Sequence, residues 1–185
     1  MSELARAALG LFAAVAPFGA LPVFLDAQVE AGDRRRVVAV MYAAALFLLG
    51  AGALVAEPFL DWLDVSTENF QLAAGLIMLP QAMQLVARGR TLSSGEAGTI
   101  VPLSAPLLAG PASLAAAMSY GTRFGEVEAV SASALVLFVT TGLLLAGHWI
   151  ERRAGGAAIG LLGRLNGALL VIIAIEMAVD GVRSV

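Results

Sequence analysis

Long apolar stretches alternate with short polar connections along the whole chain. Five stretches contain no Asp, Glu, Lys or Arg: 7–25, 37–56, 69–87, 97–122 and 129–150. Each approaches or exceeds the roughly 20 apolar residues that a helix needs to cross the hydrocarbon core of a bilayer. A sixth stretch, 160–182, is apolar at its centre but includes Arg164, Glu176 and Asp180. The pattern therefore predicts an all-α membrane protein with six transmembrane helices.

Arginine is distributed unevenly between the connections. The first, third and fifth connections hold Arg34, Arg35, Arg36, Arg88, Arg90, Arg152 and Arg153, whereas the other side has only Arg6, Arg123 and Arg183. Basic short loops stay cytoplasmic, so both termini are expected outside the cell membrane. The first span is expected to be retained, because Glu3 offsets Arg6 and the chain stays apolar to Leu25.

Two related proline motifs lie 89 residues apart. Residues 16–22 read Ala-Pro-Phe-Gly-Ala-Leu-Pro and residues 105–111 read Ala-Pro-Leu-Leu-Ala-Gly-Pro. They fall in the first and fourth spans, so each repeat has three spans and the second is inverted relative to the first. The sequence thus predicts two inverted three-helix repeats, residues 1–92 and 93–185, within one membrane domain.

The prolines also predict that the first and fourth helices are broken. Proline lacks a backbone donor and clashes with the carbonyl four residues back, and freed backbone groups are tolerated only inside protein or beside a water-lined cavity. The two breaks are therefore expected to face each other and to bind a solute, with N–H groups suited to a carboxylate. A simple kink is the alternative for one motif, but two corresponding interruptions favour a site. The candidate residues at the breaks are Pro17, Phe18, Gly19, Pro22, Ser104, Pro106, Gly110, Pro111, Ala112 and Ser113.

Intramembrane polar residues supply further candidates. Ser104 and Ser113 flank the second motif, and each hydroxyl either binds a ligand or returns to its own helix backbone. Gln71, Gln81 and Gln84 share much of one face of the third span, and these residues either line the pathway or join neighbouring helices. Asn166 in the sixth span has the same two interpretations, and Gln71 and Asn166 are taken as the site candidates. Glu176 is a candidate for proton coupling, with interfacial solvation as the alternative. His148 is interpreted as an interfacial residue.

Composition excludes several functions. Only 14% of residues are charged, the 11 basic residues are all arginine, and mean hydropathy is +0.88. Short arginine clusters between apolar stretches do not form a basic surface for nucleic acid. Without cysteine and with a single histidine, neither a cofactor nor a metal site is expected. No serine has a nearby base, so an enzyme is not expected.

Four segments resemble the MarC family of multi-pass bacterial inner-membrane proteins, related to the LysE exporter superfamily. They are APFGALPVFL (16–25), AAGLIMLP (73–80), IVPLSAPLLAGPASL (100–114) and GRLNGALLVIIAIEMAVDGV (163–182). The resemblance implies six spans, inverted repeats and, in one branch of the family, transport of small neutral amino acids such as glycine and alanine. The family usually has asparagine where this chain has Ala16, and glycine where it has Ala112.

These observations favour a secondary transporter or exporter of a small zwitterionic solute that works by alternating access. The expected partners are the solute and the lipid bilayer. The sequence does not decide between a monomer and a homo-oligomer. The alternative is a non-transporting membrane scaffold or partner-binding protein, whose proline motifs are structural kinks. The alternative predicts a tightly filled centre between the two motifs.

Overall fold

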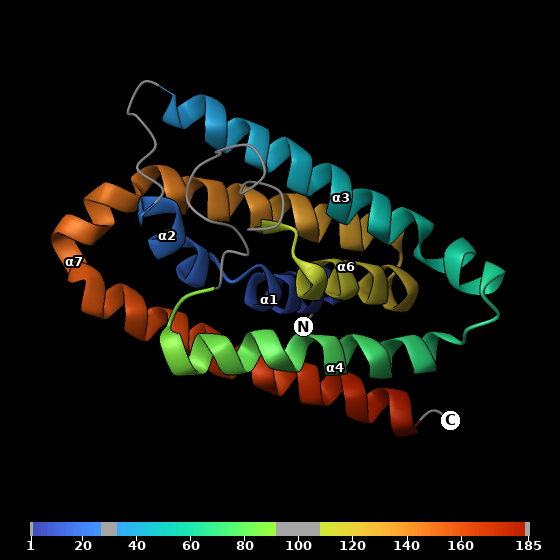
Figure 1. Ribbon diagram of the computed structural model, residues 1–185. Coiled ribbons are helices and arrows are strands. Elements are labelled where there is room, and N and C mark those ends of the chain that lie inside the picture. The colour runs from blue at the N-terminus through green and yellow to red at the C-terminus, as the bar shows by residue number, and fades with distance from the viewer. Residues whose placement is uncertain (1, 27–32, 92–107, 184–185) are drawn as a thin grey trace.

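All regular secondary structure in the described part of the chain is α-helical. The computed structural model describes residues 2–26, 33–91 and 108–183. The elements, coloured along the chain in Figure 1, are α1 (Glu3–Val15), α2 (Pro17–Asp26), α3 (Arg34–Trp62), α4 (Thr67–Arg88), α6 (Pro111–Phe124) and α7 (Glu126–Arg183). They form one bundle, in which α7 contacts each of the other elements.

Four segments are long and apolar enough to cross a membrane: Glu3–Asp26, Arg34–Trp62, Thr67–Arg88 and Glu126–Arg183. The last is 58 residues long, more than twice what a bilayer requires. Gly155 interrupts it with φ 78° and ψ 156°, and Figure 1 shows α7 bending sharply and returning. Its two arms correspond to the fifth and sixth predicted spans, so counting them separately gives five in the described residues.

The six transmembrane helices predicted from the sequence are not all present among the described residues, and the difference lies in the fourth span. That span was expected over 97–122, but the described helix there, α6, has only 14 residues. It begins at Pro111 because proline fits the first turn of a helix, where its missing N–H is not needed. The preceding residues 92–107 lie outside the described part of the chain, so a full fourth span stays a prediction.

Glycines hold α4 against the second arm of α7, and the two run antiparallel (Figure 1). A Cβ atom added at Gly75 would lie 2.5 Å from the carbonyl oxygen of Ala174, and one at Gly181 would lie 2.6 Å from that of Glu68. Gly167 meets Leu85 in the same way. Small residues allow such close approach of membrane helices, so this seam fixes the position of the sixth predicted span.

Arginine-rich segments gather at one end of the bundle. Arg34, at the start of α3, contacts His148 in the first arm of α7 and lies over the ring of Phe24. Arg90, after α4, pairs with Asp26 at the end of α2. At the opposite end Arg123 pairs with Asp180, with Nη1 and Oδ2 2.9 Å apart. This grouping agrees with the sequence prediction that the first, third and fifth connections lie on one side.

Candidate functional site at the break in the first helix

The first span is broken at the predicted motif. Helix α1 ends at Val15, Ala16 adopts the left-handed conformation with φ 52° and ψ 61°, and α2 begins at Pro17. Val15, Ala16 and Pro17 are all buried. The break therefore lies inside protein, where backbone groups released from a helix need other partners. Pro22, by contrast, lies within α2 and does not end it.

Two side-chain amides from other elements bind the carbonyls released by the break. The N–H of Ala16 still donates to Phe12, but Pro17 has no N–H for the carbonyl of Ala13 four residues back. Asn166 in the second arm of α7 replaces it, with Nδ2 2.9 Å from the Ala13 oxygen. Gln81 in α4 donates to the Ala14 oxygen at 2.8 Å. The break is thus held by two elements that are distant in the sequence.

Asn166 has one satisfied and one unsatisfied polar atom. The residue is 5% exposed, and its Oδ1 atom is buried with no hydrogen-bond partner among the described residues. A buried acceptor without a donor costs about 1–3 kcal/mol. Asn166 therefore joins the second arm of α7 to the break, and its Oδ1 atom is left without a partner among the described residues. Its binding of a solute stays a prediction.

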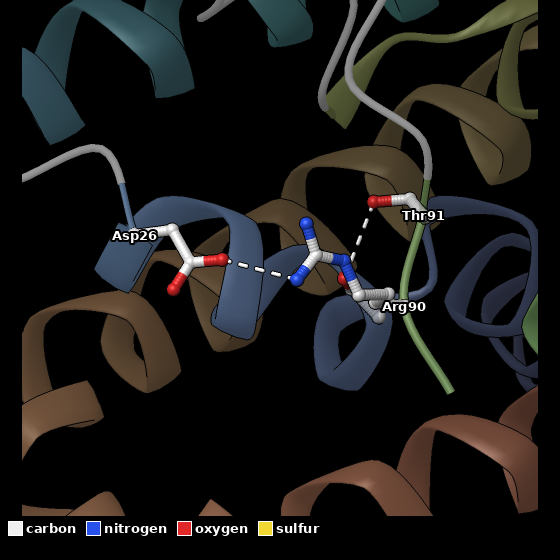
Figure 2. Close-up of polar contacts among 4 residues, drawn as sticks. Asp26, Arg90 and Thr91 are labelled. Atoms are coloured by element: carbon white, nitrogen blue, oxygen red, sulfur yellow. Dashed lines mark hydrogen bonds and ion pairs between the residues drawn. The ribbon is translucent and has the colours of Figure 1, made fainter. Parts of the chain in front are cut away.

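The start of α2 is fixed by the segment that follows α4. The N–H groups of Gly19 and Ala20 both donate to the Ala16 carbonyl at 2.9 Å, so the first turn of α2 is tightly closed. Thr91 donates to the Gly19 carbonyl through its N–H at 3.1 Å and through Oγ1 at 3.2 Å. Figure 2 shows Thr91 beside the ion pair of Arg90 with Asp26, in which Nη1 and Oδ2 are 3.1 Å apart.

Glycine at position 19 allows Leu85 and Thr91 to approach the first turn of α2 closely. A Cβ atom there would collide with the side chain of Leu85 and lie 3.2 Å from Cγ2 of Thr91. Phe18, next to it, is half-buried and meets Phe12 edge to face, with ring centroids 6.1 Å apart. Pro17, Phe18 and Gly19 therefore shape the break by packing, and the binding of a solute by these residues stays a prediction.

The second motif is described only at its end. Ser104 and Pro106 lie outside the described residues. Gly110 is extended, with φ −70° and ψ 173°, and caps α6, whose first residues are Pro111, Ala112 and Ser113. The chain is thus non-helical directly before Pro111, and α6 packs against α1, where the Tyr120 hydroxyl occupies the space beside Gly10.

Ser113 uses its hydroxyl locally. Its Oγ atom lies 3.1 Å from the carbonyl oxygen of Leu108 and 2.9 Å from that of Gly110, and the residue is 1% exposed. Of the two interpretations offered by the sequence, the structure therefore shows the return to the neighbouring backbone. Pro111 is exposed, whereas Ala112 is buried.

Gln71 and Glu176 lie apart from the break. Gln71 is buried, but it precedes Gln81 by ten residues of one helix, about 15 Å along its axis. Glu176 follows Asn166 by the same interval and is exposed. Gln81 and Thr91 contact the break instead. The sequence placed Gln81 on the same face as Gln71 but selected only Gln71 as a site residue, and it gave no signal for Thr91. A glutamine among several in one span carries no signal of its own, because the packing register selects the one that reaches the carbonyls.

An apolar helical bundle with a buried broken helix defines a polytopic membrane protein. Comparison with known proteins agrees: residues 1–185 match the family described as MarC family integral membrane protein. The chain therefore belongs to the MarC family of integral membrane proteins.

Relatives from bacteria and archaea align over nearly their whole length. The UPF0056 inner membrane protein YhgN of Escherichia coli (strain K12) is 31% identical to this chain, and the alignment covers 99% of this chain and 98% of the relative's chain. The UPF0056 membrane protein MJ1677 of Methanocaldococcus jannaschii is also 31% identical, covering 94% and 92%. The UPF0056 membrane protein YhcE of E. coli K12 is 25% identical over 96% and 90%. No solved structure matches significantly.

Proposed function

We propose that this protein is a secondary transporter or exporter of a small zwitterionic solute, of the size and charge of glycine or alanine. The observation that carries the proposal is the buried break at Ala16–Pro17, where Asn166 and Gln81 bind the released carbonyls. Interrupted helices at the middle of a membrane bundle are the usual binding elements of secondary transporters. No step of this proposal changes a covalent bond, so the protein is not proposed to be an enzyme.

Helix ends of opposite polarity near the break suit a zwitterion. The C-terminal end of α1 carries partial negative charge on its released carbonyls, and the N-terminal ends of α2 and α6 carry partial positive charge. In α6 the first bond within the helix runs from the N–H of Leu114 to the Gly110 carbonyl at 3.0 Å. The N–H groups of Ala112 and Ser113 precede that bond, so they are the proposed donors to a carboxylate.

Two inverted three-helix repeats, 1–92 and 93–185, are proposed as the moving units. Gly75 within α4 and Gly89 directly after it are spaced like Gly167 and Gly181 in α7, with fourteen positions in each pair. Gly75 of α4 contacts the second arm of α7, and Gly167 of that arm contacts α4. Because the two helices run antiparallel, exchanging the first repeat with the second turns each of these contacts into the other. That relation supports a sixth span and alternating access by rocking of the repeats. The bacterial inner membrane is the proposed location, with the arginine-rich end in the cytoplasm.

A non-transporting scaffold is the second candidate function. The break is filled in this structure, because the Ala13 and Ala14 carbonyls already bind side-chain amides. A centre closed in this way is what a purely structural kink requires. The two candidates differ in whether Asn166 and Gln81 exchange these bonds during a transport cycle.

Flux into proteoliposomes tests the proposal. Purified protein should accumulate radiolabelled glycine or alanine with saturable kinetics, above the level of empty vesicles. Asn166→Leu should reduce the flux about tenfold or more. The solute would lose the hydrogen bond between its own charged group and the Asn166 amide, and such a bond is worth about 1.5–3 kcal/mol. Thr140→Val is the matched control, because the buried Thr140 hydroxyl bonds only to its own helix, at the Val136 carbonyl.

The scaffold would be favoured by one result. If correctly folded protein moved neither solute above empty vesicles in either direction, transport of this solute class would be disproved. A flux that rose linearly without saturation would instead indicate a passive channel.

A further inference from the structure

The break concentrates uncharged oxygen atoms at the negative end of α1. Proline at position 17 removes the donor for the Ala13 carbonyl, and the left-handed Ala16 turns the chain away before the Ala14 carbonyl is bonded in the helix. Both carbonyls point toward side-chain amides. The partial charge of a helix C-terminus adds to their negative potential, which favours a cation.

Asn166 adds a third oxygen to this group. Its Nδ2 atom binds the Ala13 carbonyl, and its Oδ1 atom is attached to the same carbon and has no partner in the described structure. A half-turn of the amide would place Oδ1 toward the Ala13 oxygen. Two oxygens that face each other in a buried site need a positively charged group or a donor between them.

We propose that Asn166 Oδ1 and the Ala13 and Ala14 carbonyls form a binding site for a monovalent cationic group. All three ligands are neutral, and a buried divalent ion would require carboxylates to balance its charge. In the part of the chain that the structure describes, no group of three or more His, Cys, Asp or Glu side chains could hold a metal ion. Oxygens of carbonyls and side-chain amides suit a hard ion such as Na⁺ or a three-donor ammonium group.

Binding exchanges one set of partners for another. The cation releases the Asn166 amide from donating to Ala13, and Gln81 is able to release Ala14 in the same way. Because Gln81 belongs to α4 and Asn166 to α7, occupation of the site changes how both elements hold the break. The cation therefore acts on the joint between α1 and α2.

The cationic group has two chemical sources. It is an alkali metal ion, or it is the ammonium group of a solute, and only the second source rests on the proposed transport function. Three salts separate them at equal ionic strength: sodium chloride, methylammonium chloride and choline chloride. Choline is the reference, because its quaternary nitrogen is bulky and has no N–H donor.

Thermal unfolding of the full-length protein in detergent tests the site without any flux. Ligand that binds only the folded state raises the unfolding temperature. We expect sodium or methylammonium, relative to choline, to raise it by a few degrees. A shift with sodium identifies a metal ion, and a shift with methylammonium alone identifies the ammonium group. Failure of transport would leave this result unaffected.

Variants separate a cation site from a purely structural cap. Asn166→Leu should weaken the apparent affinity for the effective cation about tenfold or more, whereas Thr140→Val should retain it. Asn166→Asp, measured at alkaline pH, should lower stability in choline and show a larger cation-dependent shift, since a carboxylate facing a carbonyl needs a cation. Equal unfolding temperatures in all three salts, or an unchanged shift in Asn166→Leu, would overturn the proposal. If Asn166→Leu fails to fold, the Asn166→Asp result decides.

Discussion

Single residues determine where the first span breaks and what compensates for it. Pro17 removes the N–H that would bond Ala13, and Asn166 supplies the missing donor at 2.9 Å. Ala16 carries the change of direction in the left-handed region, which costs an L-residue roughly 1–2 kcal/mol. Asparagine tolerates the left-handed conformation better than alanine, so an asparagine at this position would have a backbone role as well as a ligand role.

Replacement of Ala16 by glycine should stabilise the protein. Relief of the left-handed strain outweighs the greater chain entropy of glycine, for a net gain of about 0.5–1 kcal/mol. Ala20→Gly is the matched control: Ala20 is equally buried but lies within α2, so it should lose about 1 kcal/mol. Thermal unfolding in detergent measures both. Equal losses in the two variants would show that the conformation of Ala16 carries no strain.

Helices pack in this bundle by bringing their backbones together at glycines. The seam between α4 and the second arm of α7 sets the register that places Gln81 and Asn166 on the same pair of carbonyls. A shift of one turn along the seam would bring other residues to the break. The site therefore depends on glycines that never touch it.

Gly75→Ala should destabilise the protein by about 1–3 kcal/mol through overpacking. Its new Cβ would meet backbone atoms of Ala174 and Ala178, which cannot move without shifting α7. Gly142→Ala is the control, because nothing lies within 4 Å of a Cβ there. That variant should be neutral or gain up to about 1 kcal/mol from helix propensity. Comparable unfolding midpoints for the two variants would contradict a close-packed seam.

The whole molecule has one arginine-rich end and an opposite end marked by the loop between α3 and α4. Exposed Glu151 lies near the turn of α7 at the first end, and exposed Asp61 lies near the end of α3 at the other. Short basic segments are retained in the cytoplasm, so this asymmetry predicts that the arginine-rich end of the bundle faces the cytoplasm.

Cysteine labelling should establish that orientation directly, because the natural chain has no cysteine. In intact bacterial cells, a membrane-impermeant maleimide should label Asp61→Cys and should label Glu151→Cys only after lysis. Labelling of both variants after lysis serves as the control for exposure. The reverse pattern in intact cells would show that the arginine-rich end faces outward.

Local chemistry in the sequence predicted much of this architecture. Apolar length alone defined the spans that the structure contains, since a helix must match the thickness of a bilayer. Proline chemistry placed the break beside Pro17, because a missing donor has the same consequence in any fold. Pro22 shows the limit of that reasoning, since α2 continues through it.

Partners across the bundle could be decided only by the tertiary structure. The sequence named several intramembrane polar groups and selected Gln71 and Asn166 from them. Helix packing brought Asn166 and Gln81 to the released carbonyls and left Gln71 about 15 Å along its helix from Gln81. Ser113 likewise became a backbone contact. Periodicity fixes what one helix exposes on each face, whereas the register between helices arises from contacts between residues far apart in the chain. For this protein the sequence determined where the first helix breaks, and the packing of α4 and α7 decided which side chains hold the break.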